Sequence, residues 1–90
     1  MLYMVIERFK NREAIPVYRR FREKGRMMPE NLAYVESWVE TNFGRCFQLM
    51  ECDDARLLEE WAANWRDLVE FEFVPVSTSK QAAELIAPKL

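Results

Sequence analysis

LAYVESWVETNFGRCFQLMECD, residues 32–53, is the stretch that decides the fold of this chain. Apolar and polar side chains alternate from Leu32 to Thr41 and again from Arg45 to Asp53, which is typical of two half-buried strands. Between them, Asn42-Phe43-Gly44 supplies residues suited to a short turn with a positive φ angle. The stretch therefore predicts a β-hairpin at the centre of the sequence.

The N-terminal side of the hairpin predicts a strand followed by a helix. Residues 2–10 are rich in branched and aromatic side chains, which favours a strand. Apolar positions then recur at helical spacing from Ile15 to about Met28. Gly25 ends or loosens this helix, and Pro29 forbids its continuation.

The C-terminal side predicts a second helix, a fourth strand and a short final helix. Asp53-Asp54 caps a helix whose apolar positions reach Leu68. Residues 69–76 form the strand, and Pro75 places it at a sheet edge because proline cannot donate to a ladder. Thr78 and Gln81 have the spacing of a capping box for the last helix.

The predicted element order is β-α-β-β-α-β with an extra C-terminal helix. Ninety residues without a linker or repeat fit one domain, residues 1–90. Two crossovers around a central hairpin give an α+β ferredoxin-like sandwich, in which both helices cover one face of an antiparallel sheet.

The alternation divides the strand residues between the two faces of this sheet. In each strand, alternate residues share one face, and the more apolar of the two sets is expected under the helices. This set is Met4, Ile6, Val35, Val39, Phe47, Leu49, Phe71 and Phe73. The open face would then hold Tyr3, Val5, Glu7, Tyr34, Glu36, Trp38, Cys46, Gln48, Met50, Cys52, Glu70, Glu72, Val74 and Val76. The first strand could take either assignment, because its two parities are almost equally apolar.

The predicted open face carries too many apolar side chains to remain in water. Packing against a second copy would hide it, and two sheets face to face would form a dimeric α/β barrel. Polar groups enclosed in that barrel need a partner or a ligand. The candidate pocket residues are Glu7, Glu36, Trp38, Gln48 and Glu72.

Each candidate residue has a structural alternative. The carboxylates could act as general bases after burial raises a pKa, or they could pair with arginines at a wet barrel mouth. Trp38 could stack on a flat ligand or pack within the dimer. Gln48 could orient a ligand or form a hydrogen bond across the interface.

Composition excludes several classes of function. There is no histidine, which removes histidine bases, Ser-His and Cys-His pairs and histidine-ligated metals. We therefore expect no metal and no cofactor. A net charge of −2 disfavours nucleic acid, and no apolar run is long enough to span a membrane. Cys46 and Cys52 are too far apart along one strand to form a disulfide, which favours the reducing cytoplasm.

Two helix features receive structural interpretations. Trp61 and Trp65, four residues apart, are expected in the core rather than in a cofactor site. Residues 8–26 are basic and residues 46–72 are acidic, which predicts pairing between the two helices. Arg19, Arg20 and Arg22 are expected near Glu59 and Glu60; an anion or RNA site on the basic helix is the alternative.

Four sequence blocks resemble a bacterial family catalogued only as a domain of unknown function. They are Val5-Ile6-Glu7-Arg8-Phe9, Ser37-Trp38-Val39-Glu40, Cys46-Phe47-Gln48-Leu49-Met50-Glu51 and Phe71-Glu72-Phe73-Val74-Pro75-Val76. The family is similar to the dimeric α/β-barrel superfamily, and the resemblance implies a ferredoxin-like fold and a face-to-face homodimer. It implies no activity. Cofactor-independent monooxygenases, muconolactone isomerases and haem-degrading enzymes share the superfamily, but many depend on histidine, so no catalytic residue is carried over.

Two functional hypotheses follow. In the first, a small cytoplasmic homodimer binds a small organic molecule in the inter-subunit barrel, where cofactor-independent proton-transfer or oxygenase chemistry could follow. In the second, the same residues fill the interface of a non-catalytic structural or interaction dimer. A cavity of some 300 Å³ or more favours the first.

Overall fold

The computed structural model describes all residues, 1–90, and confirms the predicted order of elements. The elements are β1 (Leu2–Phe9), α1 (Ile15–Lys24), β2 (Ala33–Val39), β3 (Arg45–Glu51), α2 (Arg56–Ala63), β4 (Val69–Val76) and α3 (Ser79–Ile86). Short 3₁₀ turns follow β1 and α3, at Lys10–Arg12 and Ala87–Lys89. None of the helices has the length and apolar character needed to cross a bilayer.

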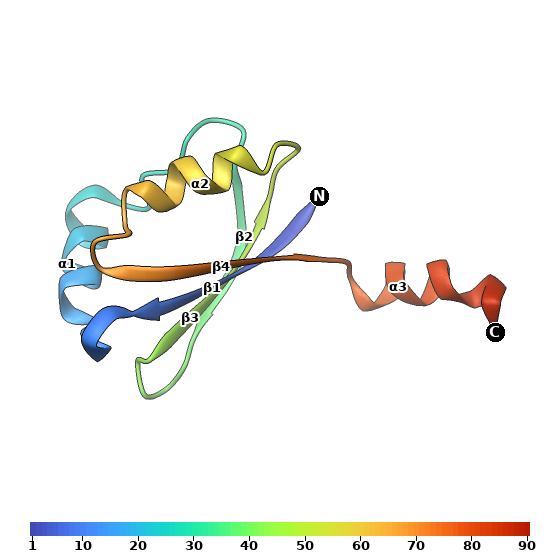
Figure 1. The fold of residues 1–90 in the computed structure, drawn as a ribbon, viewed down its shortest axis with the longest axis horizontal. Coiled ribbons are helices and arrows are strands. Elements are labelled where there is room, and N and C mark those ends of the chain that lie inside the picture. Colours follow the sequence, from blue (N-terminus) through green and yellow to red (C-terminus); the bar gives the residue numbers. More distant parts are fainter.

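The four strands form one antiparallel sheet in the order β2-β3-β1-β4. This is the order of the ferredoxin-like sandwich, and β4, with Pro75, lies at an edge as predicted. Helices α1 and α2 lie on the same side of the sheet (Figure 1). Val17 of α1 and Leu58, Trp61 and Trp65 from α2 and its C-terminal turn join one buried cluster with sheet residues such as Val5.

Helix α1 ends at the glycine that predicts its end, and α2 ends earlier than the sequence predicts. Helix α1 stops at Lys24, because Gly25 adopts a left-handed φ of 67° that turns the chain away. Helix α2 stops at Ala63, and tighter i to i+3 hydrogen bonds carry residues 64–68 towards β4. At its start the N-cap residue is Ala55, which makes no side-chain capping bond, and the Asp54 carboxylate just before it accepts a hydrogen bond from the Arg56 amide at 3.0 Å.

The predicted assignment of faces is wrong for β1 and β3. In β1 the helix side carries Val5, Glu7 and Phe9, all buried. In β3 it carries Cys46, Gln48, Met50 and Cys52, the last just beyond the strand's end. Met4, Ile6, Phe47 and Leu49 consequently lie on the open face. The rule that polar residues point outwards fails because Glu7 and Gln48 hydrogen-bond to each other and can therefore be buried.

A β-bulge in β2 shifts its alternation by one residue. The pairing with β3 passes from Tyr34 opposite Met50 to Glu36 opposite Leu49, leaving Val35 as the extra residue. Tyr34 therefore faces the helices, whereas Glu36 and Trp38 face the open side. Val35, predicted under the helices, is exposed; Val39 is placed as predicted, because it contributes to the cavity beneath the helices.

Pairing between the basic and acidic stretches occurs, with different partners from those predicted. Arg20 forms a bidentate ion pair with Asp67, both N–O distances being 2.7 Å, rather than pairing with Glu59 or Glu60. Glu59 instead pairs with Arg66, seven residues further along the chain. Trp61 and Trp65 are buried in the core, as expected.

The last helix stands apart from the rest of the fold. Helix α3 extends beyond the end of β4 and away from the sheet (Figure 1). Its predicted capping box is confirmed, since Thr78 Oγ1 accepts from the Gln81 amide and Gln81 Oε1 accepts from the Thr78 amide, each at 3.1 Å. Every residue of α3 is nevertheless exposed, including Leu85 and Ile86.

Candidate functional site

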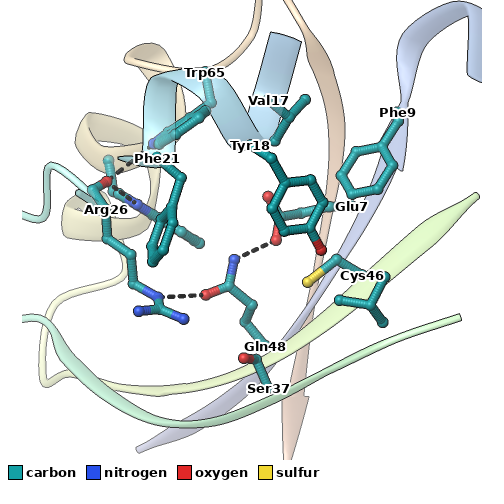
Figure 2. A pocket seen from close by; sticks show the side chains of 12 residues that line it. Glu7, Phe9, Val17, Tyr18, Phe21, Arg26, Ser37, Cys46, Gln48 and Trp65 are labelled. Atoms are coloured by element: carbon teal, nitrogen blue, oxygen red, sulfur yellow. Dashed lines mark hydrogen bonds between the residues drawn. The ribbon is translucent and has the colours of Figure 1, made fainter. Parts of the chain in front are cut away.

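A cavity of about 270 Å³ lies between the sheet and the two main helices. Side chains of β1, β2, β3, α1, α2 and the segments that follow both helices line it, and most are apolar: Glu7, Phe9, Val17, Tyr18, Phe21, Arg26, Ser37, Val39, Cys46, Gln48, Trp61 and Trp65 (Figure 2). A mostly apolar cavity with a few polar groups is the usual form of a small-molecule site.

The polar groups of the cavity form one continuous row. Gln48 Nε2 donates a hydrogen bond to Glu7 Oε2, and Arg26 Nε donates to Gln48 Oε1 at 3.2 Å (Figure 2). Glu7 and Gln48 are only 5% and 8% exposed. They come together because β1 and β3 pair Val5 with Gln48, which sets Glu7 one diagonal step away. The row is held by the sheet at one end and by the segment after α1 at the other.

Burial decides the protonation of this cluster. Desolvation raises the pKa of Glu7, and hydrogen bonds to Gln48 and Cys46 and the charge of Arg26 offset part of this effect. Burial, with the nearby Glu7 charge, raises the pKa of Cys46 to about 12, so this thiol stays protonated and is not a nucleophile. Burial also raises the pKa of Tyr18. Glu7 is therefore the residue of the cluster whose pKa burial moves towards neutral pH.

The backbone of Arg26 is fixed by three side chains from α2 and the turn that follows it. The indole N–H groups of Trp61 and Trp65 both donate to the Arg26 carbonyl, each at 3.0 Å. Asn64 Nδ2 donates to the Met27 carbonyl, also at 3.0 Å. Gly25 and Met27, on either side of Arg26, have left-handed φ angles of 67° and 57°. A non-glycine residue in this region costs energy, and the surrounding hydrogen bonds stabilise it here.

The side chain of Arg26 contacts two aromatic rings. Its guanidinium carbon lies 3.8 Å from the centre of the Tyr34 ring and 5.0 Å from that of Phe21. Both distances are within the range of a cation–π interaction. The sequence reasoning missed Arg26, Tyr18 and Ser37 as site residues. The buried indoles of Trp61 and Trp65 indicated that an acceptor was needed, but not that Arg26 supplies it.

The structure brings two of the five predicted pocket residues together and separates the other three. Glu7 and Gln48 line the cavity, beneath the helices rather than on the open face. On the open face, Glu36 accepts a hydrogen bond from the Ser37 amide at 3.1 Å and Glu72 lies 3.5 Å from Arg8. Trp38 is 51% exposed there. No group of three or more acidic or thiol side chains is arranged to hold a metal ion.

Replacing Glu7 with glutamine is expected to flatten the pH dependence of stability. Because the pKa of Glu7 is raised in the folded state, its stabilising contribution is complete below the unfolded pKa near 4.5 and is lost as pH rises through the folded pKa. Glu7→Gln removes this loss, so the free energy of unfolding should fall less between pH 5 and 8. Urea unfolding at several pH values across this range measures the free energy of unfolding of both proteins.

Glu72→Gln on the exposed face is the matched control and should leave the pH profile as in the wild type. The chain has no histidine, so few other side chains titrate in this interval. Parallel profiles for the wild type and Glu7→Gln would contradict the prediction.

Comparison with known proteins identifies the family of this chain. The sequence model of a family described as a domain of unknown function, DUF3303, matches residues 1–90. No curated protein and no solved structure matches the chain significantly.

Proposed function

The chain belongs to the DUF3303 family, and we propose that its function is to bind a small organic molecule in the cavity beneath α1 and α2. The observation that supports this is the polar row formed by Arg26, Gln48 and Glu7 along one wall of an otherwise apolar cavity. This site replaces the inter-subunit barrel as the place of binding, because Glu7 and Gln48 face the helices.

The cavity, at about 270 Å³, is slightly smaller than the 300 Å³ expected of a small-molecule site, and this volume limits the size of the molecule. A water molecule takes about 30 Å³ of liquid, so 270 Å³ corresponds to about nine waters. A ligand on the order of ten non-hydrogen atoms fits, with its apolar part among residues such as Val17 and Trp61. If a reaction follows binding, Glu7 is the group placed to accept or return a proton without a cofactor.

Filling the cavity is expected to abolish binding. Val39→Phe adds a ring at a position that lines the cavity, and phenylalanine is favoured in strands. Thermal-shift screening with small aromatic and lactone compounds measures the effect, because a ligand at 100 times its Kd adds about 2.7 kcal/mol to wild-type stability. The variant should show no shift with compounds that stabilise the wild type.

Val35→Phe is the matched control, since it makes the same change in the same strand at the exposed bulge residue. It should keep the wild-type shifts. Compounds that stabilise the wild type and Val39→Phe equally would place their site outside the cavity and defeat the proposal.

A second proposal concerns the open face, where we infer that a homodimer forms, as in the dimeric α/β-barrel superfamily. Ile6, Phe47 and Trp38 are paired in register across β1, β3 and β2 and form an apolar row on the uncovered side of the sheet. Helix α3 is equally unpartnered, and a helix of eight residues is marginal in water without packing.

One chain thus carries an uncovered sheet face and an uncovered helix, and a second copy can cover both by two-fold symmetry. Sedimentation at micromolar concentration tests this proposal. We expect a dimer, and a monomer would contradict the proposal. If the dimer forms but no ligand enters the cavity, the protein is a structural or interaction dimer.

The proposed location is the cytoplasm, where Cys46 and Cys52, both buried and unpaired, stay reduced.

A further inference from the structure

Arg26 is a cation on the cavity wall without an anionic partner. Its Nε donates to Gln48, while its two terminal amino groups have no acceptor within the chain. None of the ion pairs of the fold includes it, although Arg8, Arg20, Arg45, Arg56 and Arg66 all have one. A partly buried charge normally needs a partner, so this cation is the exception among the cavity side chains.

The fold holds this cation in place on the wall of the cavity. Its carbonyl is fixed by Trp61 and Trp65, and its guanidinium rests against Tyr34 and Phe21. These ring contacts take up none of the N–H donors of the group, and only Nε has an acceptor. The N–H edge of arginine is the part that binds a carboxylate through two parallel hydrogen bonds.

The charges of the cavity favour a single negative charge on the ligand. Arg26 is the one cationic residue of the lining, and Glu7 is the one acidic residue. The Glu7 carboxylate already accepts a hydrogen bond from Gln48, whereas the terminal amino groups of Arg26 have no acceptor, so the unpartnered charge in the cavity is positive. Tyr18 and Cys46 both stay neutral, because burial raises the pKa of each.

We propose that the molecule bound in this cavity is a small organic carboxylate, whose anionic group pairs with the terminal amino groups of Arg26. Its apolar body lies in the remainder of the cavity, among side chains such as Val17, Phe9 and Trp61. A phosphate ester is a poorer match, because it carries more than one negative charge at neutral pH and the cavity offers one cation. The inference rests on the proposed function and adds the chemical class of the ligand.

Matched probes separate charge from shape. Benzoate and phenylacetate are compared with benzamide and phenylacetamide, their neutral counterparts of nearly the same size, by calorimetry or chemical-shift titration of the full chain. The wild type is expected to bind each carboxylate at least about tenfold more tightly than its amide, as a charge-assisted bidentate pair provides.

Three variants locate the effect at Arg26. Arg26→Gln removes the charge, and the carboxylates should lose at least about tenfold in affinity while the amides change little. Arg26→Lys keeps the charge but loses the planar guanidinium, so its affinity for the carboxylates should lie between those of the wild type and Arg26→Gln. Arg22→Gln removes an exposed charge from α1, outside the cavity lining, and should bind as the wild type does. The indole hydrogen bonds go to the main chain, so these variants retain that anchor.

The outcomes separate this inference from the proposed function. Equal binding of carboxylates and amides by the wild type, or unchanged carboxylate affinity in Arg26→Gln, overturns the carboxylate inference and leaves small-molecule binding standing. If neither class binds the wild type, both fail. If Arg26→Gln does not fold, the Arg26→Lys result and the wild-type preference decide between these outcomes.

Discussion

Trp61→Ala is expected to lower the free energy of unfolding by about 3–5 kcal/mol, the cost of removing a large aromatic side chain from a core. Trp61 is 1% exposed, and its ring packs edge-on against Phe71 with centroids 5.5 Å apart. Domains of this kind have a total stability of about 5–15 kcal/mol, so the variant keeps at most a part of it. Urea unfolding monitored by circular dichroism measures the loss.

Two further substitutions separate the sources of this effect. Trp61→Phe keeps an aromatic ring but loses the N–H donor to Arg26, and it is expected to cost about 1 kcal/mol for the hydrogen bond plus a smaller packing loss. Tyr3→Phe removes a hydroxyl near the chain terminus and should change stability by less than about 0.5 kcal/mol. A loss below about 1 kcal/mol in Trp61→Ala would show that Trp61 does not anchor the core.

Trp38→Glu is expected to weaken the proposed homodimer by at least about 2 kcal/mol, or roughly thirty-fold in Kd. Trp38 stands beside Phe47 on the open face, and in the single chain half of its surface is already exposed. A charge there costs the monomer little, whereas a dimer would have to bury it without a partner. Sedimentation across a concentration series measures the change.

Ile15→Glu is the control for this prediction, because Ile15 is also an exposed apolar residue but lies on α1, on the other side of the molecule. It should leave the dimer unchanged. An equal shift in both variants would mean that general surface charge, rather than the open face, governs association.

The elements and their order could be predicted because each has a local cause. Alternation in residues 69–76 predicted a strand with the bounds that β4 has, and the Thr78–Gln81 spacing predicted the capping box that starts α3. Gly25 predicted the end of α1 because its left-handed φ is a property of the residue itself. Such signals depend on neighbours within a few residues and are visible in the sequence.

The faces of the sheet could not be predicted, because they depend on partners distant in the sequence. Glu7 and Gln48 are polar when considered singly, and only their contact across 41 residues permits both to be buried. The bulge at Val35 reverses the alternation of β2 without any glycine or proline to indicate it. Two of the candidate residues were correctly singled out as enclosed polar groups, but for the wrong side of the sheet.

Arg26 was beyond prediction for a related reason. Its role depends on the turn that it occupies and on indole donors 35 and 39 residues away. In the sequence it is one of several arginines in a basic stretch. The structure distinguishes it by its place in the cavity lining and by its two aromatic neighbours.

The shared acceptor of Trp61 and Trp65 gives the chain a built-in optical reporter. Both indoles point their N–H groups at the segment that carries Arg26, so a small displacement of this segment alters the surroundings of two fluorophores at once. Trp38 is the third tryptophan and lies on the opposite side of the sheet, and replacing it with phenylalanine would remove its contribution to the emission. Emission from the remaining pair would then follow occupancy of the cavity without an attached dye.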